Sequence, residues 1–429
     1  MKILLCNYRY FFAGGPERYM FNLIDGLQER GHEVVPFSLR YRQNKPTPYS
    51  KYFASPVGTD MDIYFSKTRK TPAAISKLFY RLFYDVEIEK AVGKQIVDTK
   101  PDVAYLLLYL RKLSPSILIG IKRRNIPMAV RLSDYYMMCP ARTFLRNDQP
   151  CTLCMQGNII SSVRYGCVQQ SYLASIANYF ATIYHRSIKA FDLIDRFVLT
   201  NQFMYECMVK AGFPEKKLVV IQTFVNSSIF HPNPKKGKKN YIAYVGFLEH
   251  IKGVHVLIDA FALLRTNRPA LDITLQIAGE GDNAYFVSLK QQVRRLNLEN
   301  SVVFLGEQNT DEIVNLLNQA YLSVVPSLWY ENLPNAILES YGCGTPVLAS
   351  NLGSLIYCVN DGVTGFLFRP GEYNHLAERL AFCFDHPEKV AVMGQNARRV
   401  SETTYSRLAH LNKLEALFVE LISKKSSSN

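Results

Sequence analysis

Long apolar runs are missing from this chain of 429 residues. No uninterrupted apolar stretch reaches the ~18 residues that a membrane-spanning helix requires, so the sequence predicts no transmembrane segment. The first residues, MKILLCNY, carry one lysine and are not followed by a small-residue cleavage site. We therefore expect no signal peptide and a cytosolic chain. No repeat of about 20–50 residues is visible either.

Acidic residues are scarce in the first half of the chain. Residues 1–220 hold 31 Lys and Arg against 17 Asp and Glu, whereas residues 221–429 hold 19 of each kind. A basic face suits an anionic membrane surface or a nucleic acid, with an unpartnered solvated surface as the alternative. The composition, 48% hydrophobic and 20% charged, is that of a globular protein, and the length predicts two domains.

Strands and helices alternate along the chain as they do in Rossmann-like units. The first unit opens with a strand at Lys2–Cys6, a loop containing Gly14-Gly15, a helix over 17–30 and a strand at Glu33–Phe37. A helix over 73–97 and strands at 102–109, 127–131 and 197–200 follow a long loop over 40–72. After a linker at 219–240, further strands are predicted at 241–246, 273–278, 302–306, 322–326 and 346–349. The pattern predicts an α/β fold in which two Rossmann-like domains face each other across a cleft.

The stretch 326–345, PSLWYENLPNAILESYGCGT, joins a strand to a helix. The N-terminus of such a helix offers unpaired backbone N–H groups and the positive end of a dipole, which together favour phosphate. Glu331 lies just before the helix, and Glu339 lies within it. Carboxylates accept hydrogen bonds from hydroxyl groups such as those of a ribose or a hexose. These residues predict a nucleotide-sugar site, with Lys252 available to a diphosphate.

Further motifs of the second half are shared with a known family. Over about residues 240–385 the chain closely resembles the retaining glycosyltransferases of family four, which have the GT-B fold. A weaker resemblance covers Gly14-Gly15-Pro16-Glu17. The motifs that carry the match are Gly246…Lys252-Gly253, Gly279-Glu-Gly281, Phe304-Leu-Gly306, Pro326-Ser327, Glu331-x7-Glu339, Gly344-Thr-Pro-Val347 and Asp361-Gly-x-Thr-Gly365.

The resemblance implies roles for the matching positions. Glu331 is similar to the carboxylate that contacts hydroxyls of the donor sugar, and Glu339 to the ligand of the ribose. Lys252 resembles the diphosphate-binding lysine, and Gly15 the backbone that meets the phosphate from the other domain. Other donor contacts are expected from the strip after Glu331 and from the end of the strand at 302–306: Asn332, Leu333, Pro334 and Glu307.

The resemblance also implies transfer with retention at the anomeric carbon. No enzymic nucleophile is evident, so a front-face route is expected, in which the leaving diphosphate accepts the proton of the acceptor. The predicted catalytic residues are Glu331, Asp134 and Lys252, and no catalytic metal is needed.

Two positions depart from the family pattern. Phe247 stands where the family usually has an arginine, so a cation for the diphosphate must come from elsewhere; the candidates are Lys252, Arg131 and Arg142. Ser133 stands where many relatives have a histidine. Because serine is no base at neutral pH without an activating partner, we assign a catalytic or acceptor-contacting role to Asp134. A helix-capping role for this aspartate is the alternative.

Four of the nine cysteines cluster in an insert over residues 139–167: Cys139, Cys151, Cys154 and Cys167. The spacing C-x11-C-x2-C-x12-C suits tetrahedral zinc, so we expect a structural zinc site, with an iron–sulfur cluster or free thiols as alternatives. A subgroup of family-four enzymes that act on lipid-linked sugars has a similar insert in the acceptor domain. The other cysteines are expected to be small core residues: Cys6, Cys207, Cys343, Cys358 and Cys383.

The resemblance assigns a task to each part of the chain. Residues 1–215 would form the acceptor-binding domain and residues 216–400 the domain that binds a UDP-, GDP- or dTDP-sugar. Residues 401–429 would contain a helix that returns to the first domain. The expected acceptor is a saccharide, linked to a polyprenyl diphosphate, in bacterial surface-polysaccharide synthesis.

The predicted helix at 172–191 is rich in aromatic residues, and the predicted helix at 73–97 has Leu78, Phe79, Leu82 and Phe83 next to Lys77 and Arg81. This pattern predicts contact with an anionic membrane surface, and core packing is the alternative. We therefore expect a cytoplasmic enzyme that is peripheral at the inner membrane face. A sugar-nucleotide epimerase of the same architecture is one rival hypothesis. A zinc-bearing nucleic-acid-binding protein is another, but the neutral second half argues against it, and no nucleic-acid partner is expected.

Overall fold

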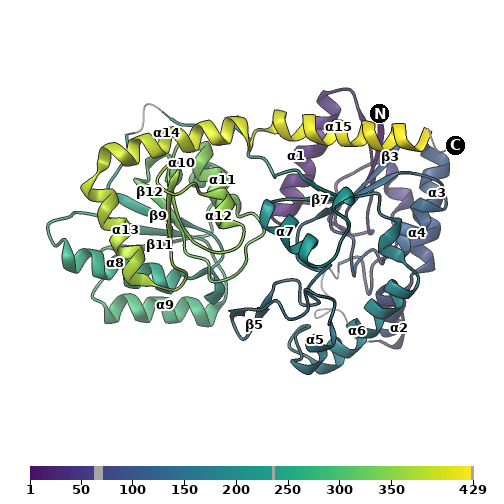
Figure 1. Cartoon of the computed structure of the whole chain (residues 1–429), viewed down its shortest axis with the longest axis horizontal. Helices are drawn as coiled ribbons and strands as arrows, with labels where there is room; N and C mark the ends of the chain where they lie inside the picture. The colour runs from purple at the N-terminus through teal and green to yellow at the C-terminus, as the bar shows by residue number, and fades with distance from the viewer. Residues whose placement is uncertain (62–70, 234–236, 427–429) are drawn as a thin grey trace.

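A computed structural model describes residues 1–61, 71–233 and 237–426, and it contains two six-stranded parallel sheets. Each sheet forms the centre of its own domain, and the two domains lie next to each other in Figure 1. The predicted α/β fold with two Rossmann-like domains is thus confirmed. In the part of the chain that is described, no helix has both the length and the apolar character needed to cross a bilayer.

The first sheet has the strand order β2-β1-β3-β4-β7-β8. Its strands are β1 (Lys2–Cys6), β2 (Glu33–Phe37), β3 (Val103–Leu106), β4 (Met128–Leu132), β7 (Arg196–Leu199) and β8 (Leu218–Val220). The helices of this domain are α1 (Gly15–Glu29), α2 (Pro72–Phe83), α3 (Val86–Thr99), α4 (Ser116–Lys122), α5 (Ile160–Arg164), α6 (Tyr172–Ser187) and α7 (Gln202–Lys210). The cysteine-rich insert adds the short antiparallel pair β5 (Leu145–Arg146) and β6 (Gln149–Pro150).

The second sheet has the order β11-β10-β9-β12-β13-β14. Its strands are β9 (Tyr241–Val245), β10 (Thr274–Ala278), β11 (Val302–Gly306), β12 (Leu322–Val325), β13 (Val347–Ser350) and β14 (Gly365–Phe368). Its helices are α8 (Val254–Asn267), α9 (Asn283–Arg295), α10 (Thr310–Gln319), α11 (Asn335–Gly342), α12 (Leu355–Cys358), α13 (Tyr373–Asp385) and α14 (Pro387–Thr403).

Both faces of each sheet are buried, which explains why the strands are apolar at every position. In β1, Leu4 packs into one core cluster while Ile3 and Leu5 pack into another on the opposite face. In β9, Ile242 and Ala243 divide in the same way between two clusters. All strand pairs in the two sheets are parallel, so the strands of each sheet share one carboxyl edge, where ligands of such folds bind.

The last helix, α15 (Arg407–Ser426), packs on the first domain although it follows the second in sequence. In Figure 1 it continues the line of α14 across to α1. Leu411, Leu414 and Phe418 join the core cluster of α1, and Arg407 pairs with Glu29 at 2.8 Å. These contacts hold α15 on the first domain.

Three local expectations differ from the structure. The helix predicted over 73–97 is two helices, α2 and α3, because Tyr84 is extended and Asp85 caps a new helix with its carboxylate. The first sheet extends beyond residue 215 through β8, and the second sheet gains β14. Both of these added strands are short and lie at sheet edges, where sequence periodicity is weak.

Candidate active site

Glu331 lies in the loop between β12 and α11, at the carboxyl edge of the second sheet, and it is nearly buried. Its Oε1 accepts hydrogen bonds from Lys252 Nζ at 2.6 Å, Ser327 Oγ at 2.8 Å and Trp329 Nε1 at 2.9 Å. Three donors on one oxygen hold the carboxylate in one orientation. The other oxygen, Oε2, is in none of these three bonds.

Lys252 ends a short 3-10 helix, His250–Lys252, that follows β9. Its Nζ lies 5.1 Å from the centre of the Trp329 ring, so the ammonium is held between an indole face and the Glu331 carboxylate. The next residue, Gly253, has φ of +71°, and an added Cβ would lie 1.9 Å from the carbonyl oxygen of Pro326. Only glycine fits there, which explains the Lys-Gly pair of the motif.

Glu339 lies on α11, and its neighbour across the domain boundary is Arg18 of α1. The Arg18 Nη1 atom lies 3.1 Å from Glu339 Oε1. Burial raises the pKa of Glu339, and the charge of Arg18 opposes that rise. Sequence reasoning missed Arg18, although its place directly after the Gly14-Gly15-Pro16-Glu17 motif was a usable signal.

Two helix N-termini meet at the same place. Helix α1 begins at Gly15 and α11 begins at Asn335, and a Cβ on Gly15 would lie 2.9 Å from Asn335 Nδ2. A cavity of about 370 Å³ at this seam is lined by residues of both domains, among them Gly15, Arg18, Thr310 and Glu339. Paired helix N-termini beside cations make a suitable place for a diphosphate.

The strip after Glu331 also lies at the domain boundary. Asn332 accepts hydrogen bonds from the first domain, Leu333 packs against a core cluster of the second domain, and Pro334 caps α11. Glu307 is exposed just after β11, at the same sheet edge, and contacts none of the other predicted donor residues among the printed interactions of the described chain. Of the predicted donor residues, Gly15 and Glu339 line the interdomain cavity, whereas Lys252 and Glu331 pair with each other in loops at the carboxyl edge of the second sheet. Asn332 joins the second of these loops to the first domain.

Asp134 lies after β4, at the carboxyl edge of the first sheet. Its Oδ1 accepts the backbone N–H of Tyr136 at 3.0 Å, and its Oδ2 lies 3.6 Å from Arg142 Nη1. Burial in the cleft raises the pKa of Asp134, while Arg142 lowers it. The next residue, Tyr135, donates a hydrogen bond to the Glu331 carbonyl oxygen at 2.9 Å.

The candidates for the missing cation lie in different places. Phe247 is 68% exposed and cannot replace a charge. Arg131 is buried in the first domain, where it donates to Thr223 Oγ1 at 2.5 Å and lies over the Tyr19 ring. Arg142 pairs with Asp134 on the acceptor side. Of the cations considered, Lys252 and Arg18 are the two that touch predicted donor carboxylates.

The four cysteines of the insert come near one another without forming a metal site. Burial first, and then the neighbouring Cys139, Cys167 and Cys151, raise the pKa of the Cys154 thiol to about 12. All four are free thiols. Within the described ranges no group of three or more His, Cys, Asp and Glu is arranged to hold a metal ion. The prediction of structural zinc is therefore not supported, because tetrahedral zinc needs its ligands converging at about 2.3 Å.

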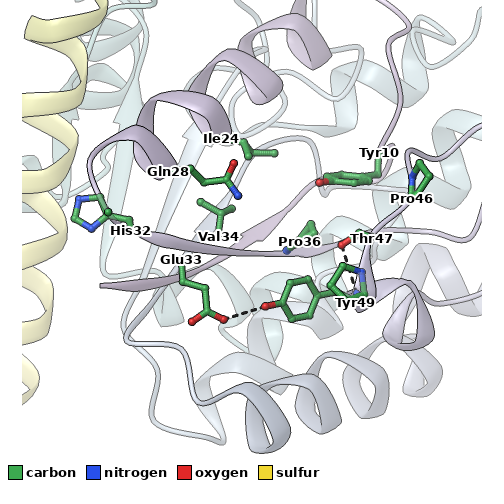
Figure 2. Close-up of a pocket in the computed structure, with 12 residues that line it drawn as sticks. Tyr10, Ile24, Gln28, His32, Glu33, Val34, Pro36, Pro46, Thr47 and Tyr49 are labelled. Carbon is green, nitrogen blue, oxygen red and sulfur yellow. Dashed lines mark hydrogen bonds between the residues drawn. The ribbon is translucent and has the colours of Figure 1, made fainter.

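A larger cavity, of about 580 Å³, lies away from this seam at the open edge of β2. Figure 2 shows it between α1 and the loop that carries Pro46, Thr47 and Tyr49, where Tyr49 Oη donates to Glu33 at 2.9 Å. It contains none of the predicted site residues. The smaller interdomain cavity is therefore the candidate active site.

Part of the chain matches a known family in sequence. Residues 226–400 match the family profile described as glycosyl transferases group 1. D-inositol 3-phosphate glycosyltransferase of Arthrobacter sp. (strain FB24) is 31% identical over 159 residues, which are 37% of this chain and 38% of that protein. Glycogen synthase of Mycobacterium tuberculosis is 34% identical over 166 residues, 39% of each chain. The chain therefore aligns with less than half the length of these curated relatives.

The whole chain resembles solved structures. Sucrose-phosphate synthase from Thermosynechococcus elongatus has a TM-score of 0.71 at 18% identity, and the match covers 99% of each chain. Anabaena HepE in complex with UDP has a TM-score of 0.67 at 19% identity, covering 98% of this chain and 100% of that one. Such likeness shows the fold. The chain has the two-domain fold of the GT-B glycosyltransferases, and residues 226–400 carry the sequence signature of the group 1 glycosyl transferases.

Proposed function

We propose that this chain is a retaining glycosyltransferase that moves a sugar from a nucleotide sugar to a saccharide acceptor carried on a polyprenyl diphosphate. The observation that carries the proposal is an arrangement of two neighbouring parts. Glu339 and the N-termini of α1 and α11 meet across the domain boundary, and Glu331 and Lys252 pair in loops at the carboxyl edge of the second sheet. Carboxylates for hydroxyls and helix N-termini for phosphates match the two parts of a nucleotide sugar. The fold is also that of Anabaena HepE, whose structure contains UDP.

In this proposal the reaction is a front-face displacement. The bond from the anomeric carbon to the diphosphate oxygen breaks, and the bond to the acceptor oxygen forms on the same face. The acceptor proton passes to the leaving diphosphate oxygen. Lys252 and the backbone N–H groups at the start of α11 stabilise the charge that develops on that diphosphate. Glu331, fixed by three donors, orients the sugar hydroxyls.

A group of cations on the first domain supports an anionic acceptor. Arg9, Lys112 and Arg142 follow β1, β3 and β4, three neighbouring strands whose carboxyl ends meet at the cleft. Burial chiefly, with Arg9, Arg81 and Arg142 adding repulsion, lowers the pKa of Lys112 to about 8. Arg9 lies 3.6 Å from Glu17 and Arg142 lies 3.6 Å from Asp134, so carboxylates already contact part of this group. The oxygens of a diphosphate would add further acceptors for the three cations. We therefore place the diphosphate of the acceptor beside Asp134, which Arg142 contacts.

An exposed apolar surface on the same domain supports a membrane-bound acceptor. Helices α2, α5 and α6 lie side by side in Figure 1, and the Phe83 and Tyr184 rings join α2 to α6 at 6.1 Å. Leu173 is 80% exposed, the highest value on this surface. We name this surface the aromatic patch: Ile75, Phe79, Tyr80, Ile160, Tyr165, Tyr172, Leu173, Ile176, Phe180 and Ile183. Aromatic and aliphatic groups on a basic domain are typical of helices that lie in a lipid interface. The enzyme would then work at the cytoplasmic face of the membrane.

A transfer assay tests the proposed activity. The purified chain is incubated with UDP-, GDP- or dTDP-sugars, with and without a polyprenyl-diphosphate-linked saccharide in vesicles. We expect nucleoside diphosphate and an elongated lipid product only when both substrates are present. Turnover of the donor without an acceptor would point to the epimerase instead. Absence of any product with every pair would contradict the proposal.

Vesicle sedimentation tests the membrane part. We expect the chain to sediment with phosphatidylglycerol vesicles at low salt, and Leu173→Ser with Phe180→Ser to weaken this binding about tenfold, since each buried CH₂ contributes ~0.8 kcal/mol. Leu408→Ser is the matched control, because Leu408 is 64% exposed on α15, outside the aromatic patch. Equal binding of all variants would contradict the assignment of this surface.

A further inference from the structure

The loop that carries Glu331 is held by the opposite domain. We name residues 329–334 the donor loop, and three consecutive residues of it contact the first domain. The Tyr330 ring stacks on Phe203 at 4.9 Å, and Tyr135 Oη donates to the Glu331 carbonyl oxygen at 2.9 Å. Asn201 Nδ2 donates to Asn332 Oδ1, also at 2.9 Å.

The second domain fixes a different part of the same loop. The Glu331 side chain is bonded to Lys252, Ser327 and Trp329, all in the second domain. Its carbonyl oxygen accepts one bond from Ser354 of the second domain at 2.7 Å and one from Tyr135 of the first. The carboxylate orientation is therefore set locally, whereas the position of the loop backbone is shared between the domains.

Asn201 also caps helix α7, and this capping bond fixes the orientation of its side-chain amide. Asn201 is the N-cap of α7, and its Oδ1 accepts the backbone N–H of Met204 at 2.7 Å. Because the oxygen is taken by the cap, the amide N–H₂ group must point the other way, toward Asn332. It contacts both the carbonyl oxygen and the side-chain oxygen of Asn332, and Thr200 Oγ1 contacts the latter as well.

These contacts are buried and rest on a rigid support. Asn201 is 3% exposed and Tyr135 is 1% exposed. Tyr135 packs on Phe144 of the cysteine-rich insert with ring centres 4.6 Å apart, and Met204 and Met208 fix α7 in the core of the first domain. Separation of the domains would remove the partners of Asn332 and of the Glu331 carbonyl oxygen. The donor loop would then lose its contacts with the first domain, at the free-energy cost of leaving these polar atoms unpaired.

We infer that Asn201 and Tyr135 are positioning residues for the donor site: they place the loop of Glu331 only when the first domain is closed on it. This inference rests on the proposed glycosyl transfer. It means that the acceptor-binding domain completes the donor site, so the sugar is aligned for transfer when both substrates can be present.

Kinetics of Tyr135→Phe and Asn201→Asp test the inference. Asn201→Asp keeps an oxygen for the α7 cap but sets a carboxylate oxygen against the Asn332 oxygens. We expect kcat to fall 10- to 100-fold in each variant, while the Kd for nucleoside diphosphate changes less than threefold. Tyr241→Phe is the matched control: its hydroxyl also donates to a buried carbonyl, that of Leu316 at 2.6 Å, but within the second domain. It should lose stability without losing kcat.

Trp329 gives a second readout that does not need activity. It is the single tryptophan of the chain and lies in the donor loop, so its fluorescence reports the loop alone. We expect the acrylamide quenching constant of Trp329 to rise at least twofold in Tyr135→Phe and Asn201→Asp, and to stay unchanged in Tyr241→Phe. Equal quenching in all four proteins, or kcat retained within twofold, would overturn the inference. If the unmodified chain transfers no sugar yet quenching changes as expected, the proposed function fails and the loop contact stands.

Discussion

The two sides of the cleft are built in different ways. On the second domain, Glu331 and Glu339 come from one stretch between β12 and the end of α11. On the first domain, the cations that we propose for the acceptor follow three separate strands and include Arg142 from the cysteine-rich insert. The two glutamates of the second domain thus belong to one local motif. The cations of the first domain come from loops that are distant in the sequence and are brought together by the fold.

Under the proposed function, this difference would divide specificity for the two substrates between the domains. A local motif keeps its geometry through the backbone of one strand–helix connection, so it suits the part of the donor that many enzymes share. Loops after several strands can change independently, so they suit an acceptor that differs between enzymes. The donor loop belongs to the second domain but is held by residues of both domains.

The largest effect is expected from the local motif. Glu331→Gln removes the charge that Lys252 pairs with at 2.6 Å, and the neutral amide oxygen that remains accepts more weakly from Lys252, Ser327 and Trp329. We expect kcat to fall about 10²- to 10³-fold, because a preorganised charge in the site is lost. Release of nucleoside diphosphate in the presence of acceptor is the measurement. Glu388→Gln is the control, since Glu388 is an exposed residue at the start of α14 that pairs with His386. Equal rates for the two variants would contradict a catalytic role for the local motif of the second domain.

A smaller and more selective effect is expected from the cations of the first domain. Lys112→Ala removes one cation from the acceptor group, and charge-assisted hydrogen bonds contribute about 1.5–3 kcal/mol. We expect kcat/KM for the acceptor to fall about tenfold, with the KM of the donor unchanged. Lys94→Ala, an exposed lysine of α3, is the control. A change in donor KM instead would assign Lys112 to the wrong substrate.

The pH dependence of kcat/KM for the acceptor gives a second test of the role of Lys112. Burial lowers the pKa of Lys112 to about 8, so this lysine carries its charge below that pH and loses it above. The value of kcat/KM for the acceptor should therefore decline as the pH rises through about 8. Lys112→Arg should remove the decline, because arginine keeps its charge. A decline that persists in Lys112→Arg would have another cause.

The smallest effect is expected where the two sides touch through Arg18. This side chain is 44% exposed, so its pair with Glu339 contributes only about 0–1 kcal/mol. Arg18→Ala frees Glu339 for ribose hydroxyls, and we expect the affinity for uridine, measured by calorimetry, to rise up to about fivefold. Arg30→Ala, which breaks a pair with Glu415 elsewhere on α1 and α15, should leave it unchanged. A loss of affinity would show that Arg18 itself binds the ligand.

The sequence could predict features that depend on local spacing, but not contacts between residues that are distant in the sequence. Glu331 and Glu339 could be singled out because their spacing reflects one local connection, and Lys252 because it stands before a glycine in the connection from β9 to α8. The two sheets followed from strand–helix alternation. The partners of these residues could not be found in that way. Arg18 meets Glu339 across 321 positions, and Asn201 meets Asn332 across 131, distances at which no periodicity acts. The cysteine spacing suggested zinc, but spacing does not specify the convergence that a metal requires.

The central claim is that the seam between α1 and α11 binds a nucleotide sugar. Calorimetry with UDP, GDP and dTDP on the unmodified chain and on Glu339→Gln tests it most directly, since Glu339 Oε1 lies in the seam and touches neither Lys252 nor Glu331 among the described contacts. The account predicts that one of these nucleotides binds at a single site and that Glu339→Gln weakens this binding about tenfold, as expected for a lost charge-assisted hydrogen bond. Equal binding by the two proteins, or no binding of any of the three, would contradict it.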